Sequence, residues 1–322
     1  MMARLLAASM AFIAVGAMSD FGQVPTFSVK IEEVRIDVLV TDNGKPVVNL
    51  KKDDFEVFDN GVAQEINYAG FEQAPIHAVL ALDMSASVAG ERLDCLKSAG
   101  QAFMDGIHKD DRAALITFNN VVSLRRPLTP DSASVKLALD ELRPSGETSI
   151  IDGSYAGLEL VDSAAGRPLL VIFSDGLDTS SWLTRAAVLD RAKRGRTVVY
   201  GISGGELRHD RFLRDLTEAT GGSLFETKSA SELEAAFVKI LEEFRQRYLI
   251  TYSPRNVAKG GWHRLTVRVK GRRLDIQARP GYGVPEAGPK RRNSTGGRMQ
   301  PKRAPVAVTM GVRPRGAQVL PG

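Results

Sequence analysis

Four short runs of apolar residues, separated by stretches with helical periodicity, limit most strongly what this chain can fold into. The runs are rich in β-branched residues, which is typical of strands buried on both faces of a parallel sheet. They lie at residues 77–82, 113–118, 169–173 and 198–202. Repeated alternation of strand and helix characterises doubly wound α/β sheets. The sequence therefore predicts a Rossmann-like α/β domain over residues 75–245.

The clearest helical pattern of the chain follows the last of these runs. Ser229 and Glu232 have the spacing of a capping box, in which the two side chains bond to backbone N–H groups at the start of a helix. Leu233, Phe237 and Ile240 then recur at the spacing of one helix face. We expect a helix from about residue 230 to 246 to end the α/β domain.

Strand-like patterns also lie on both sides of this α/β region. Before it, apolar and polar residues alternate, and the hairpin-turn tripeptide Asp-Asn-Gly occurs at 42–44 and 59–61. After it, amphipathic segments lie at 248–252, 264–269 and 274–278. Neither side offers enough strands for a core of its own. We therefore predict that residues 26–74 and 246–284 form one small β-sandwich, into which the α/β domain is inserted.

Charge is distributed unevenly along the chain, which has a formal net charge of +5. Residues 285–322 contain eight basic residues and one acid, Glu286, and they are rich in Gly and Pro without any aromatic residue. We predict that this basic tail is disordered and makes at most weak, salt-sensitive contacts with anionic surfaces. Removing its +7 and the charge of Arg4 leaves −3 for the rest of the chain. The net charge of the chain is therefore no argument for nucleic-acid binding.

The first seventeen residues resemble a secretory signal peptide. Arg4 precedes an apolar stretch, and Val15 and Ala17 are the small residues that a cleavage after Ala17 requires. A buried N-terminal helix or an uncleaved anchor is the alternative. No apolar run reaches the roughly 18 residues of a transmembrane helix, and the single cysteine, Cys95, allows no internal disulfide. The mature protein is therefore expected to be periplasmic or secreted.

Hydroxyl and carboxylate side chains lie at the ends of two predicted strands and in one loop. Asp83, Ser85 and Ser87 follow the first apolar run, Asp175 follows the third, and Thr148 lies in a Gly-containing loop before a helix. These oxygens converge if the first and third runs are neighbouring parallel strands. Each pattern alone is also a common helix cap or turn. Together they form a set of hard oxygen ligands, which predicts a site for Mg²⁺, or for Mn²⁺ or Ca²⁺.

The pattern Asp83-x-Ser85-x-Ser87, with Thr148 in its loop and Asp175-Gly176 at a strand end, resembles the metal-ion-dependent adhesion site of von Willebrand factor A (VWFA) domains. Flanking motifs resemble an exported bacterial family related to these domains, so the resemblance covers about residues 26–284. It implies an α/β VWFA domain without enzymatic activity. The implied function is capture of an Asp or Glu carboxylate of a protein partner through the cation.

Two positions depart from the family pattern. Ala86 stands where the family usually has Gly, and Val88 where Met is common. Neither position supplies a ligand side chain, so we expect cation binding to be retained. The resemblance also implies that the last helix, about residues 230–246, shifts when a ligand engages.

Two other functions remain open. The cation site is purely structural in the first, and partners bind to the β-sandwich instead. The second is a serine hydrolase, because residues 201–205 fit the G-x-S-x-G nucleophile elbow with Ser203 at its centre. Asp215 or Asp275, with His263, would then complete the triad. The charged residues after Ser203 and the lack of a Gly-rich oxyanion loop favour the non-enzymatic binding protein.

Overall fold

The computed structural model describes residues 33–71, 74–164, 166–204 and 211–285 of the 322-residue chain. The predicted signal peptide, residues 1–17, lies outside the described residues, as does the predicted basic tail from residue 286 onward. Within the described ranges, no helix combines the length and the apolar character that crossing a membrane requires.

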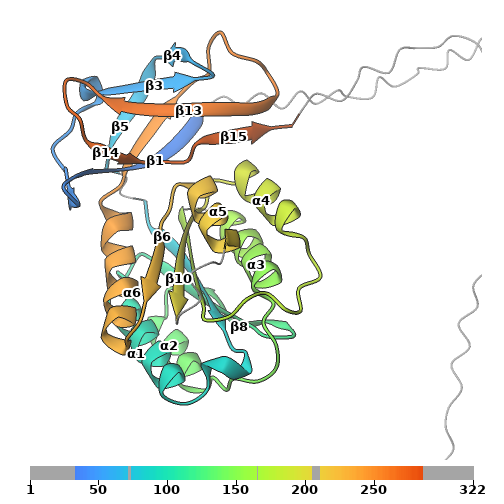
Figure 1. The fold of residues 1–322 in the computed structure, drawn as a ribbon. Coiled ribbons are helices and arrows are strands. Elements are labelled where there is room, and N and C mark those ends of the chain that lie inside the picture. The colour runs from blue at the N-terminus through green and yellow to red at the C-terminus, as the bar shows by residue number, and fades with distance from the viewer. Residues whose placement is uncertain (1–32, 72–73, 165, 205–210, 286–322) are drawn as a thin grey trace, which may run out of the picture. The chain divides into compact units, whose positions relative to one another are not determined.

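The α/β region is built on a six-stranded sheet with the order β11-β10-β9-β6-β7-β8 (Figure 1). All neighbouring strands in this sheet are parallel except β7 and β8, which pair antiparallel at one edge. The strands are β6 (Ile76–Asp83), β7 (Arg112–Phe118), β8 (Val122–Thr129), β9 (Arg167–Ser174), β10 (Val198–Gly204) and β11 (Leu224–Thr227). The predicted α/β class is thus confirmed, whereas the edge strands β8 and β11 were not foreseen.

Helices cover both faces of this sheet. On one face, α1, α2 and α6 pack on alternate strand residues such as Leu80 and Leu82, and on the other face α3, α4 and α5 pack on Val79 and Ala81 (Figure 1). Successive strand residues point to opposite faces, so both kinds of position must be apolar, which explains the continuous apolar runs. The helices are α1 (Glu91–Asp105), α2 (Ser132–Asp140), α3 (Ile150–Asp162), α4 (Arg185–Arg194), α5 (Arg211–Thr220) and α6 (Ala230–Arg245), with 3₁₀ turns η1 (Lys52–Asp54) and η2 (Ala86–Val88).

The start of α6 has the capping interactions that the sequence predicts. The Ser229 hydroxyl accepts a bond from the Glu232 backbone N–H at 3.3 Å, and the Glu232 carboxylate accepts one from the Lys228 backbone N–H at 2.6 Å. These bonds satisfy N–H groups that have no partner within the helix.

The flanking segments form two further sheets. One has the order β14-β1-β12-β5, with β2 beside β1, and the other has the order β15-β13-β3-β4. Each sheet therefore combines strands that precede the α/β region with strands that follow it. The strands are β1 (Val34–Asp42), β2 (Lys45–Pro46), β3 (Phe55–Asp59), β4 (Val62–Gln64), β5 (Ile66–Phe71), β12 (Tyr248–Tyr252), β13 (Gly261–Val269), β14 (Asp275–Gln277) and β15 (Gly281–Val284).

These two sheets share one hydrophobic core. It contains Ile36 and Ile250 from the first sheet and Val57 and Leu265 from the second. The two Asp-Asn-Gly tripeptides form tight turns in which Asn and Gly both have positive φ, at 49° and 76° in the first and 48° and 82° in the second. Such turns match the twist of antiparallel strands. The exact domain limits stay a prediction.

Three buried arginines, Arg167, Arg247 and Arg279, connect the α/β region with the flanking β segments. Their acceptors are mainly backbone carbonyls, which need hydrogen-bond partners in the interior. The bonds run from Arg167 to Asp37 Oδ1 and Phe244 O, from Arg247 to Tyr200 Oη, Asp37 O and Gly221 O, and from Arg279 to Gly281 O, Gly195 O, Ala192 O and Lys193 O.

Candidate metal centre

The five predicted ligand residues lie together at the carboxyl-terminal edge of the central sheet. Asp83 is the last residue of β6, Asp175 directly follows β9, and Thr148 lies just before α3. Ser85 and Ser87 belong to the turn around η2. Because β6 and β9 are neighbouring parallel strands, their carboxyl ends meet at this edge. The structure thus brings the five residues together, and their role as ligands stays a prediction.

Short oxygen–oxygen distances connect three of these side chains. The Ser85 and Ser87 hydroxyl oxygens are 2.9 Å apart, and Ser87 Oγ donates to Asp175 Oδ1 at 2.7 Å. The Thr148 hydroxyl lies beside the residue that follows Asp175, since a Cβ placed on Gly176 would lie 3.2 Å from its Oγ1. Ser87 is exposed, whereas the other four residues are buried. The oxygens therefore lie close together and can be reached from solvent.

Asp83 is fully buried beneath these hydroxyls. Its Oδ1 accepts a bond from the Ser85 backbone N–H at 2.8 Å, and its Oδ2 accepts one from the Ser174 hydroxyl at 2.6 Å. Burial raises the pKa of Asp83, and the nearby negative charge of Asp175 adds to this, although the bonds from Ser174 and Ser85 act in the opposite direction. A bound cation would stabilise the ionised form. Ser174 was not predicted to contribute, because its contact depends on strand pairing.

The loop that presents Thr148 is held on both sides. Gly146 has a φ of +78°, and a Cβ there would lie 1.9 Å from Asn120 Oδ1, which accepts a bond from the Glu147 backbone N–H. Only glycine fits this approach without strain. The Thr148 backbone N–H donates to the Thr179 hydroxyl, and its carbonyl accepts from the Thr179 N–H. The Thr148 side chain is therefore positioned by its backbone.

The two departures from the family pattern fit the structure. Among the described residues, a positive φ outside glycine occurs only at three asparagines, so Ala86 does not need the conformational freedom of Gly. Its backbone N–H donates to the Gly146 carbonyl at 2.9 Å. Val88 is fully buried in the core beneath α1. Both residues therefore support the turn.

Arg92, which the sequence did not single out, also reaches the site. It lies in the first turn of α1, and its Nη1 donates to Asp175 Oδ2 in an ion pair. The Asp175 side chain is fully buried and that of Arg92 is 44% exposed. No local pattern could have revealed this contact, because the two residues belong to elements that are far apart in the sequence.

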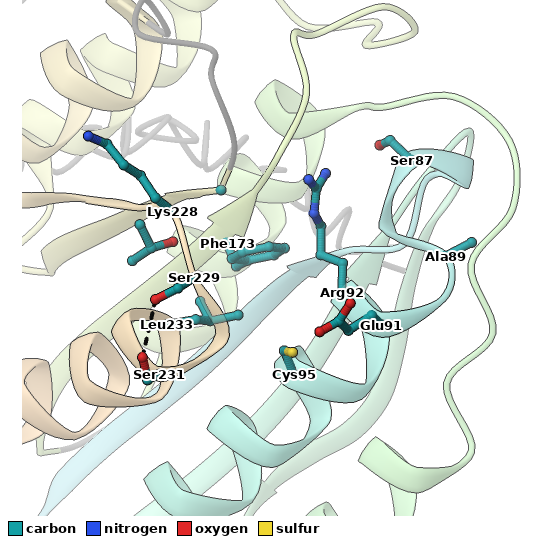
Figure 2. Close-up of a pocket in the computed structure, with 12 residues that line it drawn as sticks. Ser87, Ala89, Glu91, Arg92, Cys95, Phe173, Lys228, Ser229, Ser231 and Leu233 are labelled. Atoms are coloured by element: carbon teal, nitrogen blue, oxygen red, sulfur yellow. Dashed lines mark hydrogen bonds between the residues drawn. The ribbon is translucent and has the colours of Figure 1, made fainter.

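A cavity of about 750 Å³ lies beside the site, between α1 and the start of α6 (Figure 2). Ser87 and Arg92 line the side nearest the predicted ligands, and Lys228 lines the side formed by the segment before α6. Phe173 and Leu233 add apolar surface. The space next to the site is therefore large enough for a side chain of a partner.

The donor set fits a hard divalent cation. Two carboxylates and three hydroxyls are the oxygen ligands that Mg²⁺, Mn²⁺ and Ca²⁺ prefer. Adjacent ligands around an ion with bonds of 2.0–2.1 Å are about 2.9 Å apart, which agrees with the distances between Ser85, Ser87 and Asp175. In the described part of the chain, no cluster of three or more His, Cys, Asp or Glu residues suits a metal. The serine and threonine hydroxyls are therefore essential to the predicted site.

The residues of the alternative hydrolase are not brought together. Ser203 is buried inside β10, and the last residue of its elbow pattern lies outside the described residues. His263 lies in β13, in another sheet, where its Nδ1 is 2.8 Å from Asp59 Oδ1. Asp275 lies in β14 and Asp215 in α5. The structure therefore gives the proposed triad no support.

Comparisons with known proteins agree with the fold of the α/β region. The solved structure of a von Willebrand factor type A protein from Catenulispora acidiphila superposes with a TM-score of 0.51 at 14% identity, covering 72% of each chain. At this identity the likeness concerns the fold alone.

Two curated relatives match about half of the chain. They are an uncharacterised protein of Synechocystis, sll0103, at 24% identity over 175 residues, and a UPF0353 protein of Nocardia farcinica, at 22% over 207 residues. The matched parts cover 41% and 62% of these relatives. The family model described as von Willebrand factor type A domain matches residues 78–178, a range that includes all five predicted ligands. Residues 78–178 of this chain therefore match the von Willebrand factor type A domain.

Proposed function

We propose that this protein is an exported, non-enzymatic binding protein that captures an acidic side chain of a protein partner through a divalent cation. The cation is Mg²⁺, with Mn²⁺ or Ca²⁺ as alternatives. The observation that carries this proposal is the convergence of oxygen donors from three separate segments at one sheet edge that solvent can reach. The ligands are Asp83, Ser85, Ser87, Thr148 and Asp175.

The electrostatics of the site support a cation. Asp83 and Asp175 lie at the same edge, and both carboxylates are buried. Arg92 pairs with Asp175, but the hydrogen-bond partners of Asp83 are Ser85 and Ser174, which carry no charge. A buried negative charge is costly unless positive charge compensates it. A divalent cation supplies that charge, and it can also accept a carboxylate oxygen from outside. The proposed capture therefore needs no nucleophile and no proton transfer.

The proposed location depends on residues 1–17, whose pattern is that of a secretory signal peptide. We place the mature protein in the periplasm or outside the cell. The basic residues beyond 285 add weak attraction to anionic surfaces, without specific nucleic-acid binding.

Calorimetric titration of Mg²⁺ into the purified protein tests the cation site. We expect binding to the wild type and none to the double variant Asp83→Ala, Ser85→Ala, which lacks two of the proposed ligands. The matched control is Asp190→Ala, Ser163→Ala, which removes the same two residue types from exposed positions on α4 and at the end of α3. Absence of binding to a folded wild type contradicts the proposal.

A second titration separates partner capture from a purely structural cation site. If a carboxylate binds to the loaded site, acetate must tighten the apparent binding of Mn²⁺, because binding linkage is reciprocal. Sodium chloride at the same ionic strength is the control, with the weak association of Mn²⁺ and acetate in solution subtracted. An unchanged Mn²⁺ affinity in acetate favours the structural role.

A further inference from the structure

We infer that Arg92 sets the balance of the cation site, weakening its affinity for the cation while strengthening the attraction of the loaded site for an acidic partner. This inference rests on the proposed function. It concerns a residue outside the ligand set, and its two effects have opposite signs.

The two carboxylate oxygens of Asp175 have different partners. Oδ1 accepts the bond from Ser87 and so faces the predicted ligands, whereas Oδ2 accepts the bond from Arg92. Because the two partners use different oxygens, Arg92 can keep its ion pair while Oδ1 faces a cation. Arg92 can therefore stay beside the site when a cation is bound, without being displaced by it.

The position of Arg92 in its helix is unfavourable on local grounds. It is the second residue of α1, where the partial positive charge of the helix N-terminus disfavours a cationic side chain. Glu91 and Asp94 in the same turn are the residue types that this position favours. The interaction that compensates is the ion pair with the buried carboxylate of Asp175. The contact thus explains an arginine where the helix alone disfavours one.

Charge at the site determines both effects. Asp83 and Asp175 supply two negative charges and Arg92 one positive charge, while Glu91 and Lys228, which also line the cavity, carry opposite charges that cancel in the sum. A divalent cation therefore meets a site with a net charge of −1. The loaded site then carries +1, which attracts a carboxylate. Without Arg92 the cation would meet −2 and the loaded site would be neutral. Arg92 also lines the neighbouring cavity, so its charge acts where a partner side chain would enter (Figure 2).

The test compares wild type with Arg92→Gln, Arg92→Lys and the control Arg255→Gln, using the Mn²⁺ titrations with acetate or chloride. Arg255, in the loop after β12, pairs with Glu65, between β4 and β5, and both residues are exposed. Arg92→Gln is expected to bind Mn²⁺ about five- to tenfold more tightly in chloride, as removal of a nearby like charge predicts. The tightening caused by acetate should be smaller than in wild type. Arg92→Lys and Arg255→Gln should behave like wild type.

The outcomes distinguish this inference from the proposed function. Equal Mn²⁺ affinity of wild type and Arg92→Gln, or weaker binding by the variant, overturns the inference and leaves the cation site in place. Absence of binding in both folded proteins overturns the inference and the proposed function together. Melting curves of each variant verify that it is folded.

Discussion

At the scale of single residues, Asp83 is the site residue whose buried charge most disfavours the cation-free folded state. Its carboxylate is fully buried and has no cationic side chain among its hydrogen-bond partners, which are Ser85 and Ser174. A charge in such surroundings is unfavourable without a counterion. The residue best suited to hold a cation is therefore also one that weakens the cation-free fold.

Asp83→Asn tests this opposition of function and stability. Asparagine keeps an oxygen acceptor for the Ser85 backbone N–H and removes the buried charge. The Ser174 hydroxyl can rotate so that its oxygen accepts a hydrogen bond from the asparagine side-chain N–H. We expect the variant to lose Mg²⁺ binding and to gain about 1 kcal/mol of unfolding free energy in EDTA at pH 7, a rise of roughly 2–4 °C in Tm. Calorimetric melting with EDTA and with Mg²⁺ measures both effects, and a lower Tm in EDTA would contradict the argument.

At the scale of elements, the carboxyl-terminal end of α6 is held by several polar contacts. The Phe244 carbonyl accepts a bond from Arg167, and Arg245 donates to the Gly106 carbonyl and to Asp111. The other end of α6 borders the cavity beside the predicted cation site. The shift of this helix implied by the family resemblance would have to break these contacts, so we expect its amino-terminal turns to move more readily.

Asp111 is the central residue of these contacts at the end of α6, and its ionisation makes their contribution to stability depend on pH. Its carboxylate accepts bonds from Arg245 and from the backbone N–H groups of Ile76 and His108. Burial alone would raise the pKa of Asp111, but these bonds together hold it below its ordinary value. The folded state therefore favours the ionised form. The resulting stability is present above the unfolded pKa of 3.8 and is lost as the pH falls through the folded pKa.

Asp111→Asn should lower the unfolding free energy by about 1–3 kcal/mol at pH 7, because it weakens a buried charged hydrogen-bond network. The difference from wild type should shrink as the pH is lowered from 5 to 3. Urea denaturation across this range measures it, with Asp105→Asn, which removes an exposed carboxylate paired with Lys136, as the control. A difference that stays constant with pH would show that ionisation of Asp111 is not the cause.

At the scale of the whole described chain, one buried cluster joins segments that the α/β region separates in sequence. Asp59 in β3 accepts bonds from the hydroxyls of Tyr252 and Tyr282, both at 2.8 Å, and its other oxygen lies 2.8 Å from His263 Nδ1. Burial raises the pKa of both tyrosines, and the bonds to Asp59 act in the same direction. The two tyrosines therefore stay protonated donors, and a single carboxylate connects four strands.

Asp59→Ala should lower the unfolding free energy by about 3 kcal/mol, because it leaves three buried polar side chains without their shared acceptor. Since Asp59 joins strands from both flanking segments, protease cleavage in residues 33–71 and 248–285 should increase together. Glu65→Ala, which removes an exposed carboxylate of the same sheets, is the control. Unchanged stability, or cleavage confined to one segment, would show that the cluster does not join them.

What the sequence by itself determined are the features that depend on neighbouring residues. Strand and helix periods, the two Asp-Asn-Gly turns and the Ser229–Glu232 cap follow from local dihedral preferences and short-range hydrogen bonds, and the structure contains them. The five candidate ligands were found because each lies next to a strand or helix end. The order of parallel strands in a doubly wound sheet then brings such ends together.

Only the tertiary structure decided the contacts between residues that are distant in sequence. Arg92 meets Asp175, Ser174 meets Asp83, and Asp59 meets residues from three later strands. A charged or hydroxyl side chain has the same local pattern whether it faces solvent or a buried partner. Its role depends on strand pairing and helix packing, which bring together residues that no short-range period connects. The electrostatic balance of the candidate site is therefore a property of the fold.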